Sequence, residues 1–109
     1  MTRVAELLPD ERPREKLLSR GAGALSDVEL LAVLLRTGIR GEPVLEYSRR
    51  WLEEVGGLTG LAALDAAELQ VRPGIGAAKS AELAAALELG RRLAYSRLAD
   101  RPLLDRPEL

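Results

Sequence analysis

Only four residues, Pro73 to Gly76, separate two segments of strong helical character, and this spacing constrains the fold more than any other feature of the chain. The stretch "DAAELQVR" precedes them, and a long alanine- and leucine-rich segment from Ala77 follows. Four residues suffice only for a tight turn between two packed helices. Pro73 stops the first helix, and Gly74 and Gly76 are expected to adopt dihedral angles that a Cβ would forbid. Ile75 is then predicted to point inward and fill the space between the helices.

The composition favours helices throughout the chain. Leu, Ala, Arg and Glu dominate the 109 residues, whereas the strand formers Val, Ile and Thr together number 11. A chain of this length buries roughly two-thirds of its unfolded surface in one core without cross-links. We therefore predict a compact all-α domain of five or six helices.

Helix start and stop signals divide the chain into segments. Four helix starts carry either a proline in the first turn or a capping box, in which the cap residue pairs with a Glu three residues later. They lie at Pro13, Ser26–Glu29, Pro43 and Asp65–Glu68. Glycines are predicted to end three helices, at Gly21, Gly38 and Gly56. The stretch "LTGLAAL" is predicted to be a short connecting helix, and the last helix runs from Ala77 until Pro102 breaks it.

Two aromatic residues, Tyr47 and Trp51, lie at helical spacing in the segment after Pro43. They could stack on nucleic-acid bases. Packing in the core is the favoured interpretation, because both share an apolar stripe with Val44 and Val55 and only three aromatic residues are available. The apolar stripe of the last helix is predicted to consist of Ala81, Leu83, Ala84, Leu87 and Ala94.

The chain contains neither cysteine nor histidine. Disulfides, thiol chemistry and imidazole-based metal or triad sites are therefore excluded. An acidic cluster of Asp10, Glu11 and Glu15 is interleaved with Arg12 and Arg14, a pattern typical of a salt-bridged surface and not of an acid–base site. We therefore predict no catalytic residue, no metal and no cofactor.

The charge and hydropathy of the chain say little about its partners. The net charge of −1, from 16 basic and 17 acidic residues, neither indicates nor excludes a polyanion. The N-terminus lacks the apolar run of a signal peptide, and no segment approaches the roughly 18 apolar residues of a membrane helix. A cytoplasmic location without membrane contact is expected by default.

The turn before Ala77 has a chemical consequence for the helix that it begins. The first amide groups of a helix have no acceptor within the helix, and the helix dipole adds partial positive charge there. Beside a glycine loop without side chains, this arrangement holds phosphate well. The candidate residues of this phosphate site are Gly74, Ile75, Gly76 and Ala77, with Lys79 assisting and Arg72 as a further cation.

A related pattern occurs 36 residues earlier, in "LLRTGIRGEPVLEY". The residues Arg36, Thr37, Gly38, Ile39 and Gly41 correspond to Arg72, Pro73, Gly74, Ile75 and Gly76. This first loop is one residue longer, and Pro43 removes one amide donor from its helix start. We therefore predict a lesser phosphate site at Gly38, Arg40 and Gly41.

The stretch from Leu69 to Leu83 resembles the helix-hairpin-helix motif of DNA-binding proteins, in which the hairpin backbone holds one or two phosphates without reading bases. Two such hairpins joined by the small "LTGLAAL" helix resemble the double helix-hairpin-helix domain, a SAM-like fold of the RuvA domain 2 type that grips both strands of a duplex. The resemblance implies tandem motifs over residues 26–98. An arm and short helix at residues 1–25 precede them, and a linker or tail at residues 99–109 follows.

Over almost its whole length the chain resembles the N-terminal half of the RadC-like family, historically labelled DNA repair proteins. The resemblance rests on "ERPREKLL", "LSDVELLAVLLRTG" and "GIGAAKSAEL", although Ser48 and Ser80 stand where such domains usually have alanine. Family members usually continue into a second domain resembling JAB/MPN metalloproteases, whose histidine-bound zinc has no counterpart in these 109 residues. The resemblance implies a DNA-binding domain without sequence preference, acting on duplex or branched DNA in repair or recombination.

A helical interaction or dimerisation module that recruits or regulates a partner domain is the alternative, since many unrelated helical hairpins use glycine. Three acids near the hairpin mouths would oppose a phosphate: Glu42, Glu46 and Glu82. Pairs of arginines are expected to form salt bridges with glutamates on solvated faces more often than to contact DNA: Arg49 with Arg50, and Arg91 with Arg92. Salt dependence separates the two functions, because a hydrophobic interface survives added salt.

Overall fold

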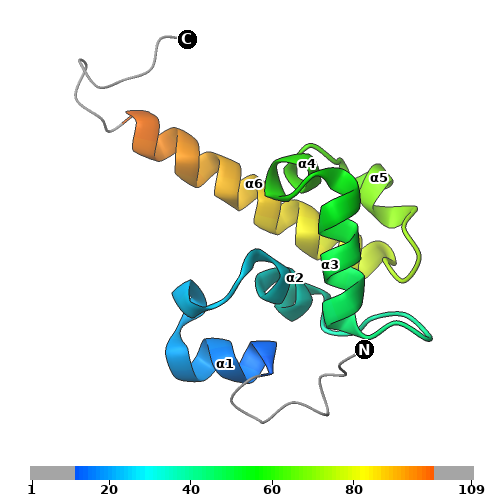
Figure 1. The fold of residues 1–109 in the computed structure, drawn as a ribbon. Coiled ribbons are helices and arrows are strands. Elements are labelled where there is room, and N and C mark those ends of the chain that lie inside the picture. Colours follow the sequence, from blue (N-terminus) through cyan, green and yellow to red (C-terminus); the bar gives the residue numbers. More distant parts are fainter. Residues whose placement is uncertain (1–11, 100–109) are drawn as a thin grey trace.

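Six α-helices and one short 3₁₀ helix make up the part of the chain that the computed structural model describes, residues 12–99 (Figure 1). In chain order they are α1 (Pro13–Arg20), η3 (Ala22–Ala24), α2 (Asp27–Leu35), α3 (Val44–Val55), α4 (Leu58–Ala62), α5 (Ala66–Gln70) and α6 (Ala77–Ala99). The predicted all-α class is confirmed. Most of the predicted arm and nearly all of the predicted tail lie outside the described residues.

Both predicted capping boxes are present. The Ser26 hydroxyl accepts a hydrogen bond from the amide of Glu29 at 3.2 Å, and the Glu29 carboxylate accepts one from the amide of Ser26 at 3.0 Å. Asp65 and Glu68 form the same reciprocal pair at the start of α5. Glu29 also accepts from Lys16 Nζ at 3.1 Å, which joins α1 to α2. Local hydrogen bonds therefore determine where α2 and α5 begin.

Helix α2 ends earlier than the sequence predicts, at Leu35 instead of Gly38. Arg36 takes a φ of 67°, which few residues with a side chain adopt. Its amide still donates to the carbonyl of Ala32 at 2.9 Å, so the chain leaves the helix at this residue. Gly38 has a different purpose, because a Cβ there would lie 2.1 Å from the backbone oxygen of Glu42. It permits close backbone packing after the helix has ended.

Two loops join the helices that carry the predicted repeat: loop A (residues 36–43) between α2 and α3, and loop B (residues 71–76) between α5 and α6. In loop A, Ile39 and Glu42 exchange backbone hydrogen bonds of 3.1 and 3.0 Å around a tip that contains Gly41. In loop B, the amide of Ile75 donates to the carbonyl three residues before it at 3.0 Å. The third residue of each turn is a glycine with positive φ, 84° for Gly41 and 81° for Gly74. By conformation Gly41 therefore matches Gly74, and not Gly76 as the sequence alignment of the two loops predicts.

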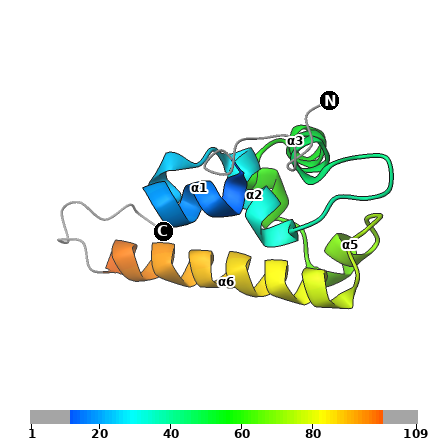
Figure 2. The same cartoon turned by 90° about the horizontal axis from the view of Figure 1, so that it is seen from below.

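The helices form two hairpins, α2 with α3 and α5 with α6, and the short α4 connects them. Helix α2 packs along α3, and the N-terminal half of α6 packs against α5 and the end of α2. Figures 1 and 2 both show loops A and B at the same end of the molecule. The two predicted phosphate sites are thus neighbours in space.

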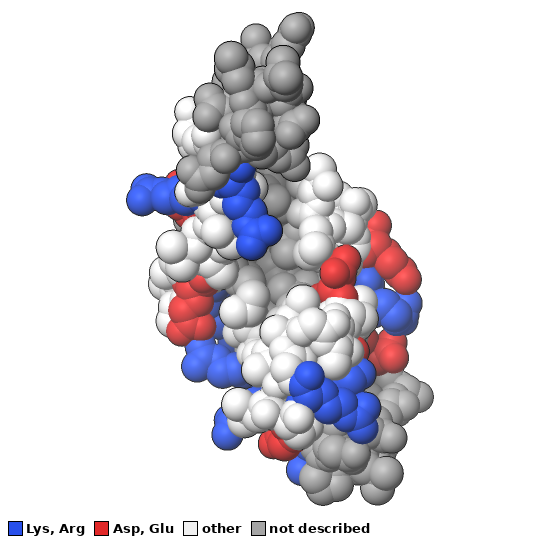
Figure 3. Space-filling view, turned by 90° about the vertical axis from the view of Figure 1, so that its left-hand side faces the viewer, with Lys and Arg blue, Asp and Glu red and all other residues white. Residues whose placement is uncertain are grey.

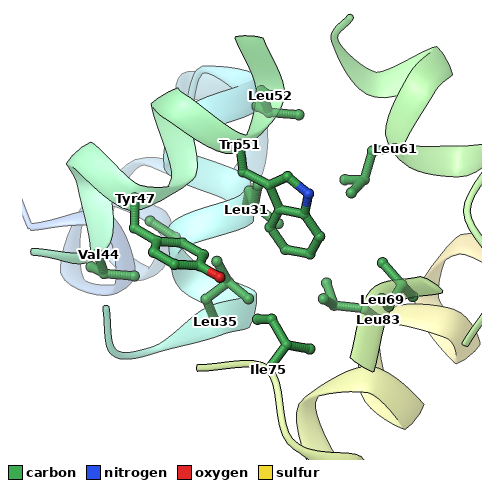
Figure 4. Packing of buried hydrophobic residues seen from close by; sticks show 11 residues of the cluster. Leu31, Leu35, Val44, Tyr47, Trp51, Leu52, Leu61, Leu69, Ile75 and Leu83 are labelled. Atoms are coloured by element: carbon green, nitrogen blue, oxygen red, sulfur yellow. The ribbon is translucent and has the colours of Figure 1, made fainter. Parts of the chain in front are cut away.

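One hydrophobic core lies between the hairpins (Figure 4). Trp51 and Tyr47 are 1% and 2% exposed, which confirms their predicted core role, and Ile75 points inward as predicted and is buried in the same cluster. The other buried residues of the cluster are Leu31, Ala32, Leu35, Val44, Leu52, Leu61, Leu69 and Leu83. The predicted stripe of α6 is partly wrong, because Ala81 and Ala94 are exposed.

The second half of α6 extends away from this core (Figures 1 and 2). Residues 88–97 are all exposed. Among them are three large apolar side chains, Leu89, Leu93 and Tyr95, which are 69%, 60% and 70% exposed. Helix α6 therefore packs in the core only through its N-terminal half.

The two serines that replace the expected alanines differ in their hydrogen bonds. Ser48 on α3 is fully buried, and its hydroxyl has no partner within residues 12–99. Ser80 on α6 is also buried, and its hydroxyl donates to the carbonyl of Ala66 at 2.7 Å, which joins α6 to α5. A buried hydroxyl without a partner destabilises a fold, whereas a bonded one stabilises it.

Replacing each serine by alanine tests this difference. Ser48→Ala is expected to raise the free energy of unfolding by about 1 kcal/mol, because it removes the unpartnered hydroxyl. Ser80→Ala is the matched control, and it should lower that free energy by about 1–2 kcal/mol, because the hydrogen bond between Ser80 on α6 and the Ala66 carbonyl on α5 is lost. Urea unfolding followed by circular dichroism measures both changes. Equal losses of stability in the two variants would contradict this description of the core.

Candidate functional site

Loops A and B are joined by polar contacts between α6 and the end of α2. Lys79 Nζ donates to Thr37 Oγ1 at 2.9 Å and to the carbonyl oxygen of Thr37 at 3.3 Å. One helical turn later, Glu82 forms an ion pair with Arg36. The residues of both predicted phosphate sites therefore form one continuous surface, which we name the loop surface (residues 36–43 and 72–79).

An apolar contact brings the two loops closer still. A Cβ built on Gly74 would lie 2.4 Å from Cγ2 of Ile39, so Gly74 has to be a glycine for Ile39 to fit. Its φ of 81° independently favours glycine. The dihedral angle predicted for Gly74 is confirmed, and the contact with Ile39 is a further reason for glycine.

Gly76 is different, and the sequence-based expectation for its backbone is wrong. Gly76 is absent from the left-handed region that Gly74 occupies. A Cβ on Gly76 would meet no atom within 4 Å. Neither backbone geometry nor packing within the described chain requires glycine at this position. Its effect is to leave open space beside the first turn of α6.

That first turn carries free amide groups. Ser80 donates its amide to the carbonyl of Gly76 at 2.9 Å, so Gly76 is the residue that caps α6. Within residues 12–99, the amides of Ala77, Ala78 and Lys79 have no acceptor, and both alanines are exposed. With its 23 residues, α6 directs the positive end of its dipole at this point. The geometry suits an anion that approaches over Gly76.

Two of the predicted site residues face inward. The Ile75 side chain is buried, so only its backbone could contribute to the loop surface. The Arg72 side chain is 16% exposed, and its guanidinium lies 4.9 Å from the ring centre of Trp51 and 5.6 Å from that of Tyr47. Its Nη1 donates to Glu54 at 2.7 Å, and this hydrogen bond holds the pKa of the Glu54 carboxyl below its ordinary value. Arg72 therefore anchors loop B to the aromatic side chains and to Glu54 of α3, on the side of the loop that faces the core.

The three acids that would oppose a phosphate all have an arginine partner. These pairs are Glu42 with Arg50, Glu46 with Arg49 and Glu82 with Arg36. The first is bidentate, with distances of 2.9 and 2.7 Å, and it lowers the pKa of the Glu42 carboxyl. Arg49 and Arg50 form further pairs along α3, and Arg91 and Arg92 pair with Glu88, as the sequence predicts. The acids are thus largely neutralised locally.

One cation of the loop surface stays available. Arg40 is exposed at the tip of loop A and makes no ion pair with any described residue. Loop A also encloses a shallow pocket of about 320 Å³, lined by residues 36–39 and 41–44. Figure 3 shows the opposite side of the molecule, where blue and red side chains lie next to each other around uncharged surface.

Two residues that organise this surface, Thr37 and Glu82, carry no signal of that role in the sequence. Thr37 holds Lys79 across 42 residues of chain, and Glu82 pairs with Arg36 across 46. No local pattern reports partners so distant in the sequence. In the sequence, the negative charge of Glu82 counts against phosphate binding. In the structure, the ion pair with Arg36 reduces this repulsion.

The described residues offer no metal site and no membrane helix. No group of three or more metal-ligating side chains occurs among residues 12–99. Within the same residues, no helix has both the length and the apolar composition needed to span a bilayer.

The two glycines of loop B should respond differently to alanine. Gly74→Ala is expected to lower the free energy of unfolding by about 1–3 kcal/mol, because the new Cβ is strained at positive φ and collides with Ile39. Gly76→Ala should change it by less than about 1 kcal/mol, since the Cβ enters open space. Thermal and urea unfolding measure the difference. Similar losses in both variants would refute the backbone geometry given for Gly76.

The link between Lys79 and Thr37 can be measured as a coupling. Thr37→Val and Lys79→Met each remove one partner, and the double variant removes both. We expect a coupling free energy of about 0.5–1 kcal/mol from a double-mutant cycle of urea unfolding, because the two side chains share hydrogen bonds. Strictly additive effects would mean that the loops are not joined through this pair.

The chain matches one family model, described as UPF0758 N-terminal, over residues 4–81. The match includes loop A, loop B and the first turn of α6, and it ends within α6. No solved structure matches the chain significantly.

Curated relatives are similar over nearly the whole chain. The UPF0758 protein Mpe_A2695 of Methylibium petroleiphilum is 55% identical over 105 residues, which are 96% of this chain and 47% of that protein. A UPF0758 protein of Desulfitobacterium hafniense is 55% identical over 102 residues, 93% of this chain and 45% of the relative. A UPF0758 protein of Chloroflexus aggregans is 52% identical over 99 residues, which are 91% of this chain and 43% of that relative. The chain spans about half the length of these relatives.

Proposed function

The chain belongs to the UPF0758 N-terminal family, and we propose that it binds DNA through backbone phosphates without reading the bases. In this proposal the amides of Gly76 and Ala77 and the backbone of Gly74 hold one phosphate. Loop A holds another through Gly38, Gly41 and the cation of Arg40. The proposal includes no catalytic step in these residues.

One observation carries the proposal: two glycine turns meet on a single surface that presents free amides and an unpaired arginine. Gly76 is the most informative residue of this surface. Because nothing in the described chain requires glycine there, the absence of a side chain is best explained by a ligand that comes close to the backbone. Phosphate is the ligand that free helical amides favour.

The presence of two neighbouring loops favours a polymer of phosphates over a single anion. Contacts among Lys79, Thr37, Ile39 and Gly74 hold the loops side by side. A nucleic-acid backbone supplies phosphates at regular spacing, and contacts to it position a protein without specifying a sequence. Ion pairs with arginines reduce the repulsion that a phosphate would meet from Glu42, Glu46 and Glu82.

The resemblance to the tandem helix-hairpin-helix domain agrees with this reading, and we extend the proposal to that fold class. We also propose that the chain is RadC-like and acts on duplex or branched DNA in repair or recombination. Lys79 then supports binding mainly by positioning the loops, since its ammonium is held by Thr37. Arg72 supports loop B from the core side.

A charge placed at Gly76 gives a direct test. Gly76→Asp and Gly76→Asn both introduce a good helix cap, so both variants should remain as stable as the parent or gain stability. Only the aspartate repels phosphate. We expect Gly76→Asp to weaken DNA binding about tenfold at low salt, and Gly76→Asn to weaken it much less. Fluorescence anisotropy with labelled duplex and branched DNA measures the affinities, and circular dichroism checks folding.

The salt dependence of the parent chain completes this experiment. At about −0.9 for each engaged phosphate, the two phosphates of this proposal should make the logarithm of the binding constant fall with the logarithm of salt concentration with a slope of about −2. Absence of salt-sensitive binding by the parent chain, or equal affinities of the Asp and Asn variants, would refute the proposal.

A second candidate function rests on a different observation. The exposed apolar residues of α6, Leu89, Leu93 and Tyr95, favour an interaction or dimerisation module. Association through these residues would persist at high salt, whereas phosphate binding would not. Sedimentation of the parent chain across the same salt series therefore distinguishes the two functions.

A further inference from the structure

We infer that the phosphate-binding surface continues from loop A past Arg36 onto the start of α1, where Arg14 contacts a further phosphate. This inference rests on the proposed DNA binding and extends it beyond the two hairpins. Arg14 lies outside every sequence motif that indicates a phosphate site. Its place beside Arg36 is a product of the tertiary structure.

Two adjoining pockets make the surface continuous. The pocket of loop A shares Arg36 and Val44 with a second pocket of about 170 Å³ between α1 and α2. The second pocket is lined by Pro13, Arg14, Glu15, Ala32, Val33, Arg36 and Val44. Arg36 therefore stands between the tip of loop A and the first turn of α1. A ligand that follows the surface from Arg40 meets Arg36 and then Arg14.

Arg36 has an unusual backbone for this position. Glycine is the ordinary residue where a helix ends with positive φ, yet this chain keeps an arginine there at 67°. Its ion pair with Glu82 is open to solvent, with side chains 60% and 49% exposed. Only Nη2 of the guanidinium contacts Glu82 within the described residues, so its remaining N–H groups can contact a phosphate while the pair with Glu82 stays formed.

Arg14 supplies a charge that no carboxylate of the described residues pairs with. It is exposed in the first turn of α1 and makes no ion pair with any residue in the described range. Glu15 lines the same pocket but forms no ion pair with Arg14. Other cations nearby are engaged, as Lys16 is with Glu29. Arg14 is thus the cation of α1 that is free to meet a phosphate.

A matched pair of arginine variants tests the inference. Arg14→Ala removes the proposed contact, and Arg97→Ala removes an exposed arginine from the far end of α6 that is also without an ion pair in residues 12–99. Both variants lose the same charge. The salt dependence of duplex binding is measured for each by fluorescence anisotropy, and circular dichroism confirms that both fold. Arg14→Lys tests whether a charge at this position restores the contact.

The expected result is a change confined to Arg14. Its alanine variant should bind duplex several-fold more weakly, with a salt slope smaller by about 0.9, the contribution of one phosphate. Arg97→Ala should keep the parent slope, and Arg14→Lys should recover most of it. The inference would be overturned if the two alanine variants lost the same affinity for duplex DNA, or if Arg14→Ala kept the salt slope of the parent chain. Either result would leave the proposed function standing. A parent chain that binds no DNA would overturn both.

Discussion

Two aromatic side chains of α3, Tyr47 and Trp51, join the two hairpins. Tyr47 and Trp51 lie edge to face with ring centres 6.1 Å apart. The first hairpin thus presents a large apolar surface to the second, which packs Ile75 into the same cluster (Figure 4). The Tyr47 hydroxyl donates to the carbonyl of Pro73, and Arg72 lies over both rings. The position of loop B beside loop A depends on the contacts that Tyr47 and Trp51 make with the second hairpin.

Local signals in the sequence predict much of the fold. The capping boxes at Ser26 and Asp65 mark helix starts, and the buried Ile75 follows from four residues between two helices. These features depend on neighbours within a few residues, so one sequence contains the necessary information. The end of α2 was harder to predict, because Gly38 resembles a helix stop and serves close packing against Glu42 instead.

Features of the candidate site that depend on distant residues could not be predicted. The residues Lys79 and Arg72 look like free cations in the sequence. Their partners Thr37 and Glu54 lie 42 and 18 residues away, and only the packing of the hairpins brings them together. The conformational match of Gly41 with Gly74 was hidden for a similar reason, because a one-residue insertion shifts the aligned pattern. The sequence shows which residues are charged, but only the tertiary structure shows which of these charges form ion pairs.

The continuous path of α6 has a mechanical consequence. Its 23 residues span about 34 Å, from the free amides at Gly76 through the core to the exposed end near Ala99. Within this span no proline interrupts the backbone hydrogen bonds. The inner half of the helix is packed in the core and its outer half continues the same axis into solvent. The helix therefore sets the direction and the distance at which a partner of its outer half would lie from the loop surface.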